Sequence, residues 1–444
     1  MSSFFSRLSQ AYSPANNLRQ LFVRPKSNFS ELDGLRALSI LSVIIFHTIT
    51  GVDFVGGLPL LNEMLHKTPK WMYWMWQGPL GVDIFFVLSG FLMGTMIFRE
   101  IDHTHKVNFK LFYLRRFLRL TPVYWFSIAL IQFTFVNAQG ERLFSFDKAW
   151  HLYLYIQNFY PQKENFMIWT WSLAVEEQFY LVVPLFLLLF YRNVKSPLIL
   201  FSILFLISFL IRWWIIADNN YFLAWKESGT EITKLSQQGA QRYYEALYVN
   251  LYSHYGPLLV GIIVAEIRLK HHAAALAFFT AKTWRSNLVF IAALAIVFYI
   301  YNYMMPDPFA DYSRPFNTFM LASFHNIFAV AIGVIVLACL YPNNFTSLMT
   351  GFLKWRIWYP IAQLSYSLYL FHALVIGGFM VGMKPIIAAQ AASSAGLQLW
   401  HIFGIFFIVL FIALIVAVIT FLFIEKPFMN LRAKPIASTA MNEK

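Results

Sequence analysis

Long apolar runs recur along the whole chain and are separated by shorter polar stretches. Each run has roughly the ~20 residues that a helix needs to cross the hydrocarbon core of a bilayer. The pattern predicts an all-α integral membrane protein, a polytopic bundle of about ten transmembrane helices. We place these spans near residues 35–52, 80–98, 119–136, 173–191, 197–217, 250–268, 287–304, 319–341, 360–382 and 400–424.

Composition supports this class. Hydrophobic residues make up 59% of the 444 residues and charged residues 12%, about half the usual share for a soluble domain. Such a chain cannot keep a polar shell around a single core. Its one cysteine, Cys339, excludes an intrachain disulfide scaffold and a zinc-thiolate site.

The distribution of charge predicts the orientation. The chain has 34 Lys and Arg against 21 Asp and Glu, a net charge of +13. In a soluble protein this excess would suggest a nucleic-acid partner, but cytoplasmic loops of membrane proteins concentrate Lys and Arg. With ten spans and both termini cytoplasmic, 22 basic residues fall on inner segments and 10 on outer loops. We therefore expect no nucleic-acid partner.

The polar segments complete the predicted organisation. Residues 1–30 contain no apolar core of signal-peptide length, so we expect a cytoplasmic N-terminal segment over 1–30, a transmembrane domain over 31–428 and a cytoplasmic tail over 429–444. The outer loops near 137–172 and 218–249 are long enough to shape a mouth over the bundle. Trp71–Trp76 and Trp150–Tyr155 are too short to span and are typical of interfacial segments.

Ionisable side chains inside spans are costly, which makes them functional candidates. Arg36 and His47 are eleven residues apart in the first span, so they differ by only about 20° around a helix and by about 16 Å along it. Asp33 lies within about 40° of the same line. The alternative is structural: Asp33 and Arg36 pair at i,i+3, and His47 is a hydrogen-bonded core histidine.

Three carboxylates share the predicted depth of His47 near the outer face. Asp83 opens the second span, and Gly90, on the same face, would let a neighbouring helix approach closely. Glu176 and Glu177 open the fourth span and point about 100° apart, so one of them is expected to face the interior. Because a carboxylate can orient an imidazole, these four residues form a candidate general-base site. Helix-terminal electrostatics or capping would explain Asp83 or one glutamate without catalysis.

The inner face carries a different signal. Arg115, Arg116 and Arg119 lie within five residues on a basic helix that leads into the third span, and Arg36 is at the same depth. A guanidinium cluster of this kind suits phosphate groups. Anchoring to anionic membrane lipid is the alternative.

The remaining titratable groups inside spans are weaker candidates for a functional role. His325 and His372 are each interpreted as hydrogen-bonded structural residues, and Arg212 can extend its charge toward the membrane surface. Walker, dinucleotide-binding, Gly-x-Ser-x-Gly and His-Glu-x-x-His motifs are absent from the sequence, so no metal site is predicted.

Over nearly all of residues 30–430, the chain resembles the membrane-bound acyltransferase 3 family. Six elements in family order carry the resemblance: Leu32-Asp33-Gly34-Leu35-Arg36 with His47, Gly81 to Phe91, Arg116-Phe117-Leu118-Arg119 before Pro122, Trp171 to Tyr180, Leu364 to Tyr369 with His372, and Glu425-Lys426-Pro427.

The resemblance implies transfer of an acyl group, usually acetyl, from cytoplasmic acyl-CoA to a hydroxyl of a cell-surface or exported carbohydrate or glycolipid. Acyl-CoA would be a co-substrate and no cofactor would be permanently bound. The arginines would hold the CoA phosphates, and His47 would deprotonate the acceptor or carry the acyl group itself. The resemblance implies a multi-pass protein of a bacterial inner membrane, here a stand-alone form without the SGNH-type hydrolase domain of some members.

Two other functions stay open at this point. A proton-coupled secondary transporter of a small acidic or acylated molecule would use the same intramembrane His, Asp and Glu residues as a proton relay. An inactive partner of a glycan-assembly machine would bind no CoA and would tolerate substitution of its charged residues.

Overall fold

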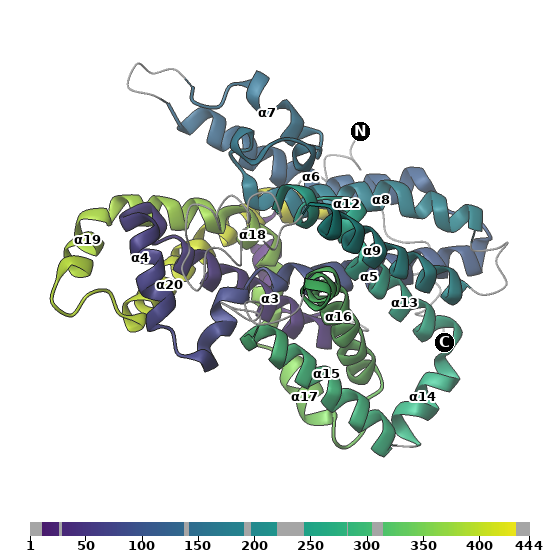
Figure 1. The fold of residues 1–444 in the computed structure, drawn as a ribbon. Coiled ribbons are helices and arrows are strands. Elements are labelled where there is room, and N and C mark those ends of the chain that lie inside the picture. Colours follow the sequence, from purple (N-terminus) through teal and green to yellow (C-terminus); the bar gives the residue numbers. More distant parts are fainter. Residues whose placement is uncertain are drawn as a thin grey trace, which may run out of the picture.

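A computed structural model describes residues 11–25, 29–136, 142–190, 197–219, 244–281, 283–303 and 314–431, which form a bundle of helices (Figure 1). Among these residues the β contacts are limited to one isolated bridge between Val136 and Arg142. The predicted all-α fold is therefore confirmed. Most of the predicted 218–249 loop and of the C-terminal tail, together with residues 1–10 and 26–28 of the N-terminal segment, lies outside the described residues.

Within the described ranges, eight helices are long and apolar enough to cross a bilayer, and each coincides with a predicted span. In chain order they are α3 (Glu31–Thr50), α5 (Leu80–Thr104), α8 (Trp171–Phe190), α9 (Pro197–Asn219), α15 (Thr283–Tyr303), α16 (Arg314–Leu340), α18 (Trp358–Gly382) and α20 (Leu399–Thr420).

The other two predicted spans are helical but different in kind. α6 (Phe109–Thr134) is one continuous helix through Pro122, so the basic segment and the apolar segment that follows it are joined. The predicted span 250–268 is divided into α12 (Leu251–His254) and α13 (Gly256–Lys270), and α13 has only 15 residues. The count of ten spans and the cytoplasmic position of both termini therefore stay predictions.

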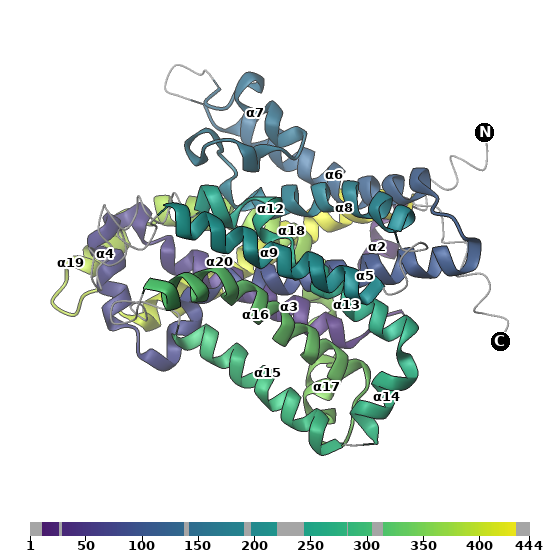
Figure 2. The ribbon, with the colours of Figure 1, turned by 45° about the vertical axis from the view of Figure 1, so that its right-hand side comes forward.

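Short helices lie around the bundle. α4 and α19 pack together at one end of it, and α7 stands away from the main body (Figures 1 and 2). Trp71–Trp76 falls in η1 and Trp150 in α7, both too short to span, as predicted. These elements are α2 (Pro14–Phe22), α4 (Asp53–Lys67), η1 (Lys70–Gln77), α7 (Phe146–Tyr153), α14 (His272–Thr280), α17 (Ser347–Leu353), α19 (Lys384–Ala392) and α21 (Lys426–Asn430).

α3 occupies the centre of the bundle and contacts α5, α18, α20, α17 and η1. A helix that is apolar around most of its circumference is stable only when it is buried. Ile40, Val43 and Ile44 of α3 are accordingly 0–1% exposed. The polar positions of this helix, which include Arg36 and His47, are therefore held in the interior, where each needs a partner.

The closest helix contact joins α5 to α13 through two glycines. A Cβ atom on Gly90 would lie 2.0 Å from the carbonyl oxygen of Leu258, and one on Gly261 would lie 2.1 Å from the carbonyl oxygen of Val87. Only glycine permits such an approach of two backbones. The close contact predicted at Gly90 is confirmed.

The glycine contact also sets the register of the two helices. Asp83 lies seven residues before Gly90, and His254 lies seven residues before Gly261. On each segment the polar residue therefore lies two helical turns before the glycine, and the two segments run parallel. As a result, Asp83 and His254 lie opposite each other.

We expect Gly261→Ala to lower the free energy of unfolding by about 1–3 kcal/mol, because the new methyl group must displace backbone atoms of α5. Thermal unfolding in detergent micelles measures the effect. Gly377→Ala in α18 is the matched control, since a Cβ there meets nothing within 4 Å. Equal unfolding temperatures for the two variants would contradict the close contact.

Candidate active site

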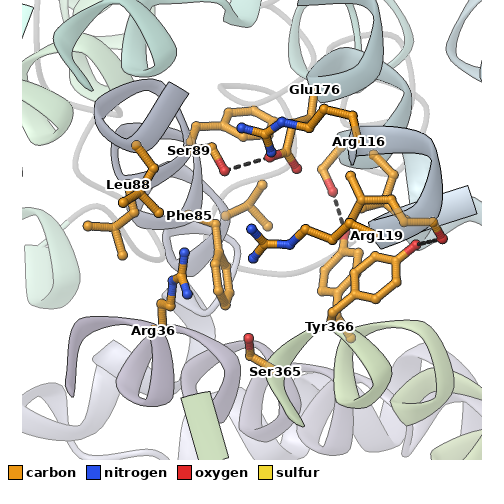
Figure 3. A pocket seen from close by; sticks show the side chains of 16 residues that line it. Arg36, Phe85, Leu88, Ser89, Arg116, Arg119, Glu176, Ser365 and Tyr366 are labelled. Carbon is orange, nitrogen blue, oxygen red and sulfur yellow. Dashed lines mark hydrogen bonds between the residues drawn. The ribbon is translucent and has the colours of Figure 1, made fainter. Parts of the chain in front are cut away.

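A pocket opens between α3, α5, α6, α8 and α18 (Figure 3). Its cavity volume is about 100 Å³, which holds several water molecules or a small polar group. The lining combines charged, hydroxyl and aromatic side chains: Arg36, Val82, Phe85, Phe86, Leu88, Ser89, Leu92, Arg116, Arg119, Leu120, Ser172, Leu173, Glu176, Ser365, Tyr366 and Tyr369.

Positive charge dominates this pocket. Its lining includes three guanidinium groups, those of Arg36, Arg116 and Arg119, and one carboxylate, that of Glu176. The guanidinium groups of Arg36 and Arg119 point toward one another across the cavity (Figure 3). Like charges that converge in a partly buried space are relieved by a bound anion, and guanidinium groups match phosphate and carboxylate geometry.

Arg36 faces the pocket because Asp33 has another partner. The Asp33 carboxylate lies 3.0 Å from Nε of Arg24, in the segment before α3. Among the described residues, no ion pair joins Asp33 to Arg36. The structural alternative of an i,i+3 pair between them is therefore wrong, and the Arg36 charge stays available to the cavity.

Glu176 is the carboxylate that faces the pocket. Ser89 Oγ donates a hydrogen bond to its Oε1 at 2.5 Å, and the Tyr180 hydroxyl donates to the same oxygen. The guanidinium carbon of Arg116 lies 4.0 Å above the centre of the Tyr180 ring. Cation–π contact and hydrogen bonding thus hold Arg116 and Glu176 in one network.

Two predicted site residues lie away from the cavity. Glu177, about 100° around α8 from Glu176, is not among the lining residues, and its Oε1 is buried without a hydrogen-bond partner in the described chain. Arg115 does not line the pocket either. Of the two glutamates, Glu176 alone lines the pocket, and of the four predicted arginines Arg36, Arg116 and Arg119 line it.

His47 contacts a backbone carbonyl and a second histidine. Its Nδ1 lies 2.9 Å from the carbonyl oxygen of Val43 and 3.3 Å from Nε2 of His372. Nδ1 of His372 in turn lies 2.7 Å from the carbonyl oxygen of Tyr369. The expectation that Asp83, Glu176 or Glu177 orients His47 is therefore wrong.

These contacts select one tautomer for each ring. Carbonyl oxygens only accept, so Nδ1 of both His47 and His372 must donate. His372 Nε2 is then an acceptor, and the Nδ1–H of His47 is shared between it and Val43. His47 Nε2 is left with a free lone pair, the form that a general base requires.

The histidine pair lies beyond the end of the pocket that Tyr369 lines. Tyr369 lines the pocket, and its ring centre is 5.7 Å from that of His372, one turn further along α18. Arg36 and His47 share a face of α3 at a separation of about 16 Å. The arginine pocket and the histidine pair therefore lie about 16 Å apart along the same face of α3.

Asp83 belongs to a separate cluster. His254 Nε2 and His325 Nδ1 each lie 2.6 Å from one of its carboxylate oxygens. All three residues are at most 2% exposed. Asp83 is therefore not in contact with His47, and its role as a catalytic partner of His47 has no geometric support.

Sequence reasoning missed His254 altogether and gave no role to Ser89, Tyr180 or Tyr369. The signal for His254 was its position seven residues before Gly261, which matches the spacing of Asp83 and Gly90. Pairing the two glycines would have placed the aspartate and the histidine together.

The family model of an acyltransferase domain, Acyl_transf_3, matches residues 29–422. The chain belongs to the acyltransferase 3 family. No solved structure matches the chain significantly.

Named relatives of this acyltransferase 3 family chain come from bacteria and from a nematode. It is 27% identical to O-acetyltransferase OatA of Staphylococcus aureus over 84% of this chain and 52% of that protein, and 32% identical to peptidoglycan O-acetyltransferase OatA of Listeria monocytogenes over 41% and 28%. It is 26% identical to nose resistant to fluoxetine protein 6 of Caenorhabditis elegans over 84% and 48%. The chain thus spans about half or less of the length of these relatives.

We expect His47 in the resting protein to be the tautomer that carries its proton on Nδ1, because only that form donates to Val43. Nitrogen NMR of histidine-labelled protein in liposomes distinguishes the tautomers, and the signal lost in His47→Gln assigns the residue. An Nε2-protonated signal for His47 would overturn the assigned hydrogen bonds.

Proposed function

We propose that this protein is a membrane O-acyltransferase that moves an acyl group, normally acetyl, from cytoplasmic acyl-CoA to a hydroxyl of an exported carbohydrate or glycolipid. The observation that carries the proposal is that one face of α3 carries both a pocket of three arginines and, about 16 Å further along, a histidine whose Nδ1 donates to Val43.

The arginine pocket supports the donor assignment. CoA carries its phosphates at one end and its thioester at the other, joined by an extended pantetheine arm. Arg36, Arg116 and Arg119 would hold phosphate oxygens by charge-assisted hydrogen bonds. The arm would then run outward along α3 and present the thioester near His47. Glu176 leaves the pocket with a net positive charge and fixes Arg116 through Tyr180.

His47 supports the transfer step. Its Nε2 would take the proton of the acceptor hydroxyl as the oxygen attacks the thioester carbonyl. The new C–O bond forms, the C–S bond breaks, and the proton passes from His47 to the departing CoA thiolate. In the variant with an acyl-histidine intermediate, Nε2 attacks the thioester, the C–S bond breaks and CoA departs as its thiolate. The acceptor hydroxyl then attacks the acyl-imidazole, the C–N bond breaks, and the hydroxyl proton passes to the CoA thiolate, which restores neutral His47.

The relatives support the acceptor class and location. Two bacterial relatives are named O-acetyltransferase OatA, one of them a peptidoglycan O-acetyltransferase, so a cell-envelope glycan is the proposed acceptor. The apolar helices fit a multi-pass membrane protein. A bacterial inner membrane is the proposed location, with the donor on its cytoplasmic side.

We expect His47→Gln to reduce acyl transfer by at least about 10²-fold, because it removes the proposed base and leaves the helix intact. Alkali-labile O-acyl esters are measured in every envelope and exported glycan fraction of a deletion strain that carries either form. His66→Gln, at an exposed position in α4, is the matched control.

Full ester levels with His47→Gln would refute the histidine mechanism. If deletion of the gene changed no ester fraction but abolished proton-coupled flux of a small molecule, the transporter function would replace the proposal.

We expect Arg119→Ala to weaken CoA binding by about 10-fold or more, since one charge-assisted phosphate contact is lost. Calorimetry with CoA in detergent or nanodiscs measures the change, and the wild-type affinity should fall as salt rises. Arg356→Ala, an exposed arginine after α17, is the control. Equal affinities in the two variants would exclude the pocket as the phosphate site.

A further inference from the structure

A cluster of one carboxylate and two imidazoles lies in the interior, outside the pocket. Asp83 comes from α5, His254 from α12 and His325 from α16, and they are 1%, 1% and 2% exposed. Their facing oxygen and nitrogen atoms all lie within 4.8 Å of one another. A carboxylate buried this deeply must be paired or must coordinate a metal ion.

Whether Asp83 is paired with N–H groups or coordinates a metal ion depends on the imidazole nitrogens that point away from it, which we call the outward nitrogens. His254 Nδ1 and His325 Nε2 are buried without a hydrogen-bond partner in the described chain. Aromatic rings surround the two imidazoles: His254 stands nearly perpendicular to the rings of Phe86 and Tyr248, and the ring of Phe324 lies over that of His325 with centres 3.9 Å apart and planes 34° apart.

An aromatic face is negative, so it can accept an N–H but repels a lone pair. The perpendicular rings therefore favour an N–H group on the outward nitrogen of His254, and we take the same tautomer for His325, whose outward nitrogen also has no hydrogen-bond partner in the described chain. For neutral rings, the lone pairs of His254 and His325 then point at Asp83. Two lone pairs and a carboxylate that converge on one point repel one another unless a cation lies between them.

We propose that Asp83, His254 and His325 bind a divalent transition metal ion, with zinc the ion that best matches the ligands. Two histidines and one carboxylate are a known ligand set for a tetrahedral zinc ion, with the fourth position open to water or an anion. Binding would widen the 2.6 Å contacts to the roughly 3.3 Å that separates tetrahedral ligands at zinc distances.

The ion would connect three segments that are far apart in the sequence. α5 and α13 already meet at Gly90 and Gly261, and α16 packs against both; the metal would add a direct link between the three segments at the level of His254. The site would therefore fix the outer end of α5, whose Phe86 also lines the arginine pocket. This proposal does not depend on the acyltransferase reaction.

Arg212 offers the competing explanation. Its buried guanidinium donates to the carbonyl oxygens of Ala322 and Ser253, close to both histidines. A positive charge there disfavours a metal ion, and together with protonated imidazoles it could balance Asp83 without one. The experiment must distinguish these two occupants, a metal ion and protons.

The test measures the metal content of the full-length protein, purified without chelators and with any affinity tag removed. Mass spectrometry of the dissolved protein is expected to find about one zinc ion per chain, falling to below about one tenth in His325→Gln. His372→Gln is the matched control, because it alters the other buried imidazole pair, which has no carboxylate, and should keep its metal.

A second measurement covers the case in which His325→Gln fails to fold. Wild-type protein stripped with a strong chelator should melt at a lower temperature, and Zn²⁺ should restore it. Co²⁺ should give the visible absorption bands of a tetrahedral site. The proposal would be overturned if the wild-type protein contained no metal and its melting temperature did not change with Zn²⁺, Co²⁺ or Mn²⁺. The charge of Asp83 would then be balanced by protons and Arg212.

Discussion

A bilayer supplies no water to the polar groups inside it, and this constraint governs how the bundle is arranged. A charged or polar side chain at membrane depth is tolerated only when the protein provides its partner. Asp33 is paired with Arg24, Glu176 with Ser89 and Tyr180, and His47 with a backbone carbonyl and His372. The choice of partner determines which groups are left to act on a ligand.

The two ends of α3 differ because their partners differ. At the Arg36 end, Asp33 forms its ion pair with Arg24, and Arg36 adds its charge to a pocket that already holds two other arginines. At the His47 end, neutral acceptors hold Nδ1 of His47, and no carboxylate of the described residues is hydrogen-bonded to the ring. One end is therefore suited to an anion, while the other presents a neutral imidazole whose Nε2 has no hydrogen-bond partner among the described residues.

Local periodicity predicted much of this arrangement. The eight apolar helices, the shared face of Arg36 and His47, and the inward position of one glutamate follow from hydropathy and 3.6 residues per turn. The partners could not be predicted in the same way. His254 and His325 are 171 and 242 residues from Asp83, and Arg24 lies in a segment with no periodic pattern. The equal predicted depth of Asp83 and His47 suggested that Asp83 lies near His47. The glycine contact instead turns the Asp83 face of α5 toward α13 and away from α3.

This separation changes how the effect of an Asp83 substitution should be interpreted. Phe86 lies one turn from Asp83 on α5 and lines the arginine pocket, and Ser89, further along α5, binds Glu176. A change at Asp83 that shifts α5 would move both residues, because close-packed helices transmit small displacements. Lost activity would therefore fit a positioning role as well as a catalytic one. Direct participation in proton transfer would alter turnover with donor affinity unchanged, whereas displacement of the wall would weaken donor binding as well. The contacts of Asp83 with His254 and His325 favour the second outcome.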